Sequence, residues 1–188
     1  VQRAAVAVVS HSLFHSNEAK IVYVGMAAGG GVHNRGMLTM MDSTFDSNKA
    51  ISTTSQASGG ALYNVGQASG EGILLVKNEA QGNMVGEGGG VSTYRNGTLL
   101  TMSNCTFIAN KATHSGGAAF VQGMIQMNSI VFENNTAVIG PTLRVTPDAP
   151  QPDMNDISVH NNVCESEYAG SDGYGEYLQP DNFRVGPW

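Results

Sequence analysis

Charge is scarce in this sequence, because lysine, arginine, aspartate and glutamate make up only 13% of its 188 residues, about half of the usual ~25%. A helical bundle needs a charged outer face, so this composition disfavours that class. The net charge of −6 provides no basic surface for nucleic acid or anionic lipid. No apolar run approaches the ~20 residues of a membrane span, and no cleavable signal peptide is recognisable. We therefore expect no nucleic-acid partner and no membrane span in this chain.

Glycine, by contrast, is abundant, with 24 residues, and the chain repeats itself. A phrase of the form Phe-x-x-Asn-x-Ala recurs with spacings of 31, 30, 32, 25 and 27 residues. Its copies are FHSNEA from Phe14, FDSNKA from Phe45, LVKNEA from Leu75, FIANKA from Phe107, FENNTA from Phe132 and VHNNVC from Val159. Internal repeats of about 20–50 residues are typical of solenoids.

A glycine phrase follows each of the first five copies, and its last version is the degenerate GPTL at Gly140. The stretch between the two phrases varies, and it shrinks from nine residues (Lys20–Ala28) to two (Val138–Ile139). Glycine pairs suit corners where φ is positive or where neighbouring coils approach too closely for a Cβ atom. The predicted corner glycines are Gly29, Gly30, Gly59, Gly60, Gly88, Gly89, Gly116 and Gly117.

Alternation of apolar and polar residues precedes each Phe, as in LTMMDSTF (Leu38–Phe45) and LTMSNCTF (Leu100–Phe107). A period of two is the signal of a strand. Three short strands for each repeat predict one coil of a parallel β-helix, whose coils bury their apolar sides by stacking. The sequence thus predicts an all-β parallel β-helix (solenoid) of about six coils, each of three short strands.

Stacked coils place like residues on like residues at the ~4.8 Å strand spacing. The Phe column is predicted to be an interior stack, and each Asn is expected to adopt left-handed backbone geometry at a corner while its amide bonds the Asn above and below. The interior stack comprises Phe14, Phe45, Leu75, Phe107, Phe132 and Val159. The ladder comprises Asn17, Asn48, Asn78, Asn110, Asn135 and Asn162.

The repeat domain is predicted to cover residues 1–163. Residues 164–188 do not repeat, and they are acidic and contain five aromatic side chains. Because a solenoid must cover its terminal coil, we expect this segment to be either a cap or a docking segment for another subunit. At the other end, residues 1–9 resemble a strand with an open edge.

The two cysteines fall in different columns of the repeat. Cys105 shares a column with Ser43 and Ile130, whereas Cys164 shares one with Ala112 and two other alanines. They lie two coils apart, about 9–10 Å, and a disulfide needs Cα atoms within about 7 Å. We predict no disulfide and two free, buried thiols.

An enzyme is the main alternative, since polysaccharide lyases and hydrolases also use β-helices. Such sites need clustered carboxylates, but Asp42, Asp46, Asp153 and Asp156 follow their columns as turn residues would. The five histidines show no metal spacing. The sequence therefore predicts no catalytic residues, no metal site and no cofactor. Three N-x-[ST] sequons are possible glycosylation sites, at Asn96, Asn104 and Asn134.

The paired phrases FxxN and GGA[ILV], here FDSN with GGAL and FIAN with GGAA, resemble the repeats of polymorphic outer-membrane proteins and related β-helical adhesins. The resemblance covers about residues 10–163. It implies a right-handed coil and a non-enzymatic, structural or adhesive role in an extracellular or cell-surface protein, with protein subunits, cell-surface components or glycans as partners. A carbohydrate-active β-helix enzyme and a non-catalytic glycan-binding module remain the alternatives.

Overall fold

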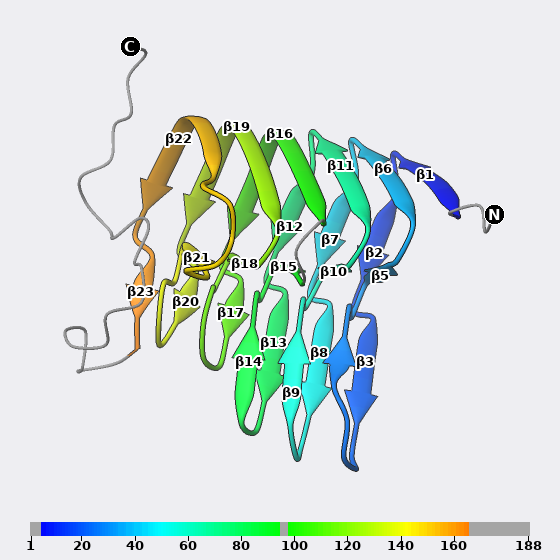
Figure 1. The fold of residues 1–188 in the computed structure, drawn as a ribbon, viewed down its shortest axis with the longest axis vertical. Coiled ribbons are helices and arrows are strands. Elements are labelled where there is room, and N and C mark those ends of the chain that lie inside the picture. The colour runs from blue at the N-terminus through cyan, green and yellow to red at the C-terminus, as the bar shows by residue number, and fades with distance from the viewer. Residues whose placement is uncertain (1–4, 95–97, 166–188) are drawn as a thin grey trace.

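The computed structural model describes residues 5–94 and 98–165. These residues form 23 strands and contain no helix, and all strand pairings are parallel. No helix long and apolar enough to cross a membrane occurs in the described residues. The prediction of an all-β parallel β-helix is confirmed (Figure 1).

The strands form four sheets. Sheet A comprises β1 (Val6–Ser10), β2 (Leu13–His15), β6 (Met37–Met41), β7 (Thr44–Asp46), β11 (Gln67–Glu71), β12 (Leu74–Val76), β16 (Leu99–Ile108), β19 (Met124–Glu133) and β22 (Asp153–His160). Sheet B comprises β3 (Glu18–Ile21), β8 (Lys49–Ser52), β13 (Glu79–Gly82), β17 (Lys111–Ala112), β20 (Thr136–Ala137) and β23 (Val163–Cys164). Sheet C comprises β4 (Ala27–Ala28), β9 (Gln56–Ser58) and β14 (Val85–Glu87). Sheet D comprises β5 (Val32–Asn34), β10 (Leu62–Asn64), β15 (Val91–Thr93), β18 (Ala119–Val121) and β21 (Leu143–Val145).

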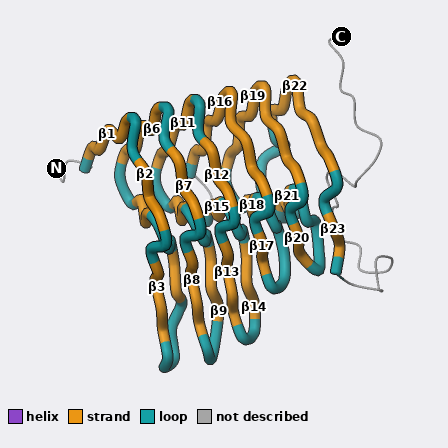
Figure 2. Tube along the Cα trace, turned by 180° about the vertical axis from the view of Figure 1, so that it is seen from behind, coloured by secondary structure: helices purple, strands orange, loops and turns teal. Residues whose placement is uncertain are grey.

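Coils 1 to 3 pass through sheets A, B, C and D in that order, coils 4 and 5 have strands in sheets A, B and D, and loops join the sheets at the edges of the stack (Figure 2). Five coils reach sheet D. A sixth begins with β22 and β23, but no sheet D strand follows them within the described residues. The prediction of about six coils counted the six Phe-Asn phrases, so it counted this incomplete turn. The predicted cap over residues 164–188 lies almost entirely outside the described residues, and it stays a prediction.

The prediction of three strands for each coil is wrong for coils 1 to 3. There the variable stretch folds out and back as β3–β4, β8–β9 and β13–β14, a projection that we call the arm. In coils 4 and 5 the outgoing strand shortens to two residues, and sheet C continues only as bridges at Ser115 and Ile139. The arm therefore projects beyond β17 and β20 in Figure 1.

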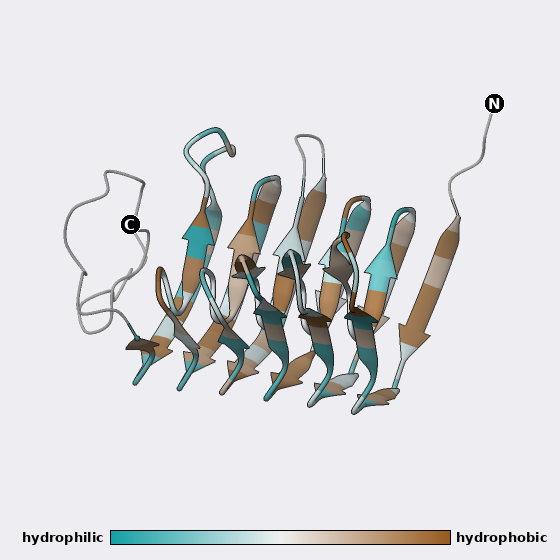
Figure 3. Ribbon diagram, turned by 90° about the horizontal axis from the view of Figure 1, so that it is seen from below, coloured by the Kyte–Doolittle hydropathy of each residue, from teal (hydrophilic) through white to brown (hydrophobic). Residues whose placement is uncertain are grey.

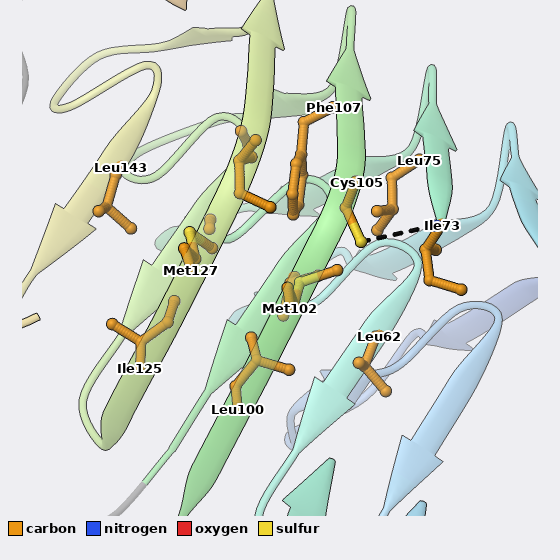
Figure 4. Close-up of a cluster of buried hydrophobic side chains, with 14 of the residues drawn as sticks. Leu62, Ile73, Leu75, Leu100, Met102, Cys105, Phe107, Ile125, Met127 and Leu143 are labelled. Carbon is orange, nitrogen blue, oxygen red and sulfur yellow. Dashed lines mark hydrogen bonds between the residues drawn. The ribbon is translucent and has the colours of Figure 1, made fainter. Parts of the chain in front are cut away.

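Sheets A and D enclose the main core, and we call this part the body. Along β6 the residues are alternately exposed and buried, as the period-two pattern predicts. The inward side chains are large and apolar, and those of neighbouring coils pack against one another (Figure 4). The same alternation appears as brown and pale bands along the strands in Figure 3. Ring stacking continues the Phe column, with centroids 4.6 Å apart for Phe14–Phe45 and 5.0 Å apart for Phe107–Phe132.

The arm has a different interior, because sheets B and C face each other across small side chains. Ala27, Ala50 and Ala57 form its buried cluster, against which Ile21 packs. A Cβ atom added at Gly86 would lie 2.3 Å from the Ala80 carbonyl oxygen. Alanine and glycine therefore allow the two sheets to approach so closely.

Left-handed backbone geometry occurs one residue before each ladder Asn, so the prediction that the Asn itself adopts it is wrong. These residues are Ser16, Ser47, Lys77, Ala109, Asn134 and Asn161, with φ between 51° and 56°. A second such column lies between the two sheet A strands of coils 1 to 3 and within the single strands β16, β19 and β22 of coils 4 to 6. It comprises His11, Asp42, Gly72, Asn104, Ser129 and Asp156. Gly72 therefore satisfies the same requirement in the one coil that departs from the polar pattern.

The glycine corner has two positions with different requirements. Gly59 has φ 66°, a conformation that costs glycine little. Gly60 lies against the next coil, because an added Cβ would be 2.2 Å from the Gly89 carbonyl oxygen. Its amide donates to the Gly88 carbonyl at 3.1 Å. In coil 5, Pro141 occupies the second position.

Candidate functional site

The six ladder asparagines form one continuous hydrogen-bonded column at the corner between sheets A and B. Asn110 shows the pattern: its backbone N and its Nδ2 both donate to Asn135 Oδ1, at 2.9 and 3.0 Å. Its own Oδ1 accepts the corresponding pair from Asn78, both at 3.0 Å. Every Asn from Asn17 to Asn135 thus donates toward the following coil.

The ladder also holds the Phe column in place. Asn110 Nδ2 donates to the Leu75 carbonyl at 2.9 Å, and Asn135 Nδ2 donates to the Phe107 carbonyl at 3.0 Å. The inner ladder members, from Asn48 to Asn135, are at most 1% exposed, so water cannot replace these bonds. The ladder asparagines and the aromatic column therefore form one structural unit.

Both cysteines are free, but their surroundings differ. Cys105 is buried, whereas Cys164 is only partly buried, so the prediction that both are buried is wrong for Cys164. It lies in β23, over which no further coil stacks in the described part of the chain. Its Sγ donates to the Val138 carbonyl at 2.9 Å.

Cys105 acts as more than an apolar filler. Its Sγ donates to the Ser103 carbonyl at 3.0 Å and accepts from the Ile73 amide at 3.4 Å (Figure 4). Ser43, in the same column two coils earlier, makes the two corresponding bonds, donating to Met41 O at 2.7 Å and accepting from Ser12 N at 3.1 Å. Burial raises the pKa of the Cys105 thiol from 9.0 to about 11, so the thiol is protonated and unreactive near neutral pH.

Two of the three sequon asparagines, Asn104 and Asn134, are exposed, and both have left-handed backbone geometry. Asn104 lies within β16, and Asn134 directly precedes the ladder residue Asn135. Asn96 lies outside the described residues. Glycosylation of these positions stays a prediction.

The acidic residues considered for catalysis do not gather. Asp42 and Asp46 lie in coil 2, whereas Asp153 and Asp156 lie in coil 6, four strand spacings or roughly 19 Å away. Asp156 accepts from Ser129 Oγ at 2.9 Å. The described residues contain no group of three or more His, Cys, Asp or Glu side chains that could hold a metal ion.

Sequence reasoning missed one constellation that resembles a catalytic triad. His15 Nε2 lies 3.1 Å from Ser16 Oγ, and His15 Nδ1 lies 3.0 Å from Asp46 Oδ2. The two nearest amides are occupied, because Ser16 N donates to the Asp46 carbonyl and Asn17 N donates to Asn48 Oδ1. They cannot form an oxyanion hole, and the side chain of His15 is 55% exposed. We interpret the three residues as a surface link between coils 1 and 2. Alignment of the two Phe phrases places His15 next to Asp46, so the sequence could have indicated this link.

The outer face of sheet D carries aromatic residues in a row. The ring of Tyr63 lies 5.0 Å from that of His33 and 6.3 Å from that of Tyr94. A sugar ring stacks on an exposed aromatic face, yet Tyr63 is only 3% exposed. Burial lowers the pKa of His33, and nearby Arg35 adds to this effect. The centre of this row is therefore packed and offers no platform for a glycan.

Sheet C carries one partly buried acid, Glu87. Gln56 Nε2 donates to Glu87 Oε2 at 2.6 Å, across the boundary between coils 2 and 3. Burial raises the pKa of Glu87, and hydrogen bonds from Gln56 and Ser58 oppose this effect. The carboxyl group is thus engaged within the protein and links neighbouring coils.

The most exposed apolar side chains lie where the arm turns back. We call this region the arm tip and define it as residues 22–25, 53–55 and 83–84. Tyr23 is 84% exposed and Val24 is 96% exposed, with Val22 at 55% and Met84 at 71%. The sequence alone gives these residues the appearance of core, and only the fold places them outside.

Comparison with known proteins identifies the repeat. The model of the Chlamydia polymorphic membrane protein repeat matches residues 42–65. This stretch begins at Asp42, the first left-handed position of coil 2. It contains the Phe and the ladder Asn of that coil, the arm strands β8 and β9, and the glycine corner. The resemblance inferred from the FxxN and GGAL phrases is confirmed, and the chain carries a repeat of this type. No curated protein and no solved structure matches the sequence.

Proposed function

We propose that this chain is a non-catalytic, structural and adhesive β-solenoid segment of an extracellular or cell-surface protein. The observation that carries the proposal is the repeat itself: coil 2 matches a repeat of Chlamydia polymorphic membrane proteins, and the other coils stack on it column by column. Its most regular side chains, the asparagines of the ladder, bond to one another and to the backbone. They serve rigidity and leave the outer faces to make contacts.

Several features support a surface role over catalysis. The two pairs of acids considered for catalysis lie in coils 2 and 6, roughly 19 Å apart, and the resemblance to a catalytic triad lacks free amides beside Ser16. A stacked solenoid also presents a long, stiff outer surface without needing any ligand to fold. Protein subunits or cell-surface components are the proposed partners, and glycans are the alternative.

Adhesion can be measured with beads that carry the purified chain. We expect beads coated with the wild-type chain to attach to cultured epithelial cells well above albumin-coated beads, without any turnover in a polysaccharide depolymerisation screen. Attachment no better than albumin would contradict the adhesive role. Any polysaccharide turnover by the chain would contradict the non-catalytic role. Turnover that survives Asp46→Asn and Asp156→Asn would place the active site elsewhere on the chain.

A further inference from the structure

The arm tip combines exposure with a fixed backbone. Coil 2 holds the tip of coil 1, because Thr54 Oγ1 donates to the Tyr23 carbonyl at 2.8 Å and Thr53 Oγ1 donates to the Val22 carbonyl at 3.1 Å. The Thr53 amide also donates to the Ile21 carbonyl at 3.1 Å. These bonds use the backbone of the tip and leave its side chains pointing away from the protein. A loop that is already ordered loses little entropy on binding.

Coil 3 extends the same surface. The Met84 amide donates to the Ser55 carbonyl at 3.2 Å, and the Asn83 amide donates to the Ser52 carbonyl at 3.0 Å. The tips of three successive coils are thus joined edge to edge, with Tyr23 at one end and Met84 at the other. Because the arm shortens abruptly in coil 4, this edge protrudes from the molecule (Figure 1).

The tip is also free of charge. None of its residues, VYVG, TTS and NM, is ionisable apart from the phenol of Tyr23. The nearest ion pair on the arm joins Lys20 to Glu18 at 3.8 Å, and the chain carries a net charge of −6. Membrane surfaces are anionic and attract basic segments, so this chemistry disfavours a lipid partner. A narrow, rigid, uncharged protrusion that carries an aromatic anchor fits an apolar cleft in a protein.

We propose that the arm tip is the contact through which this segment binds a protein partner, with Tyr23 and Val24 inserted into an apolar cleft of that partner. The contact deepens the proposed adhesive role and rests on it. The proposed contact explains why the variable stretch of coil 1 contains a Val-Tyr-Val run. This run has no counterpart in the other coils and contributes little to the arm interior. The length of the arm in coils 1 to 3 then serves to carry the contact clear of the body.

The test compares bead attachment to cells for three proteins. The first is the wild type, the second carries Val22→Thr, Tyr23→Ser and Val24→Thr, and the third is a matched control with Val6→Thr, Val8→Thr and Leu13→Thr. The control residues are equally apolar and 64–69% exposed, but they lie on sheet A. We expect the tip variant to lose attachment by about tenfold or more, as removal of an aromatic anchor does, while the control attaches like the wild type. Circular dichroism should show the same melting temperature for all three.

Equal attachment of the tip variant and the wild type would overturn the proposal and leave the adhesive role intact. Failure of the wild type to attach would instead remove the adhesive role and the proposal with it. The class of partner is tested by placing the photo-crosslinking residue p-benzoylphenylalanine at position 23 or at position 13. A crosslinked cell-surface protein found only for position 23 supports the proposal. Crosslinks to lipid alone, or binding to phosphatidylcholine vesicles that the tip variant loses, would overturn the choice of a protein partner.

Discussion

The body and the arm are built from the same coils, yet they are stabilised in different ways. In the body, large side chains such as Phe107 and Met102 fill the space between sheets A and D, so burial of apolar area is the main stabilising term. In the arm, alanines and glycines separate sheets B and C, and little apolar area is available. The arm is therefore held mainly by its backbone hydrogen bonds to neighbouring coils.

This difference teaches why one part varies and the other does not. A body position that changes size disturbs a continuous stack, whereas an arm can lengthen by adding backbone pairs to the same two sheets. The variable stretch accordingly has nine residues in coil 1 and two in coil 5. The ladder of asparagines stands between the two regions and isolates the body from changes in the arm.

The largest effect is expected at this boundary. Asn110→Ala removes the acceptor for two donors of Asn78 and the donor to Leu75 O, all of them buried. Since each unsatisfied buried group costs about 1–3 kcal/mol, the free energy of unfolding should fall by about 4 kcal/mol. Urea denaturation measures this loss. Asn128→Ala, at an exposed position of β19, is the matched control, and an equal loss in both variants would contradict the role of the ladder.

A smaller effect should separate the arm from the body. Ala57→Val adds two methyl groups between sheets B and C, where Ala57 is fully buried, and overpacking of this kind costs about 1–3 kcal/mol. In the body, Met102→Leu should cost less than about 1.5 kcal/mol, because this swap at a buried position nearly conserves the volume of the side chain. Thermal and urea unfolding compare the two variants. A body variant that is less stable than the arm variant would refute the contrast between a filled core and a close sheet contact.

Cys105→Ser should change stability by only about 1 kcal/mol, since nearly isosteric replacements are tolerated and Ser43 makes the same bonds in that column. The pH dependence sharpens the test. The folded protein keeps this proton up to about pH 11, whereas the unfolded chain releases it near pH 9.0. The stability of the wild type should therefore fall as pH rises between these values, and that fall should be absent from the serine variant. Parallel pH profiles for both proteins would show that Cys105 does not contribute.

The smallest effect is expected on the outer face of sheet B. Lys49 Nζ lies 3.0 Å from Glu79 Oε2, and both side chains retain access to solvent. Exposed ion pairs typically contribute about 0.2–1 kcal/mol. A double-mutant cycle of Lys49→Ala and Glu79→Ala should give a coupling energy within this range that disappears in 1 M salt. A coupling as large as the loss in Asn110→Ala would mean that charge, and not the ladder, fixes the stacking of the arm.

Much of the fold follows from the columns of the sequence. Aligning Met40, Met102, Met127 and Met154 gives the register that the strands adopt in sheet A. The position of the left-handed residue could not be read in this way, because serine, lysine, alanine and asparagine all occupy it and no residue type is enriched. Only the fold shows that it precedes the ladder Asn.

The arm and its tip were less accessible to prediction. Alanine alternating with polar residues in KAIS and EAQG is a weak strand signal, because alanine is not a strand former and buries little area. The run Val22–Val24 has the composition of a core strand, so composition alone places it inside. Its exposure results from the geometry of the turn, which depends on bonds from Thr53 and Thr54 in the next coil.

Pro141 has a consequence for engineering. The second glycine of coils 1 to 4 donates its amide to the following coil and leaves room for that coil's carbonyl, whereas proline has no amide hydrogen and carries a ring. Extra coils could therefore be inserted between coils 2 and 3 to lengthen the molecule. A coil joined after coil 5 would lack the amide hydrogen bond and the space that the second glycine provides at this corner. A designer who wants a longer rod should first replace Pro141 with glycine.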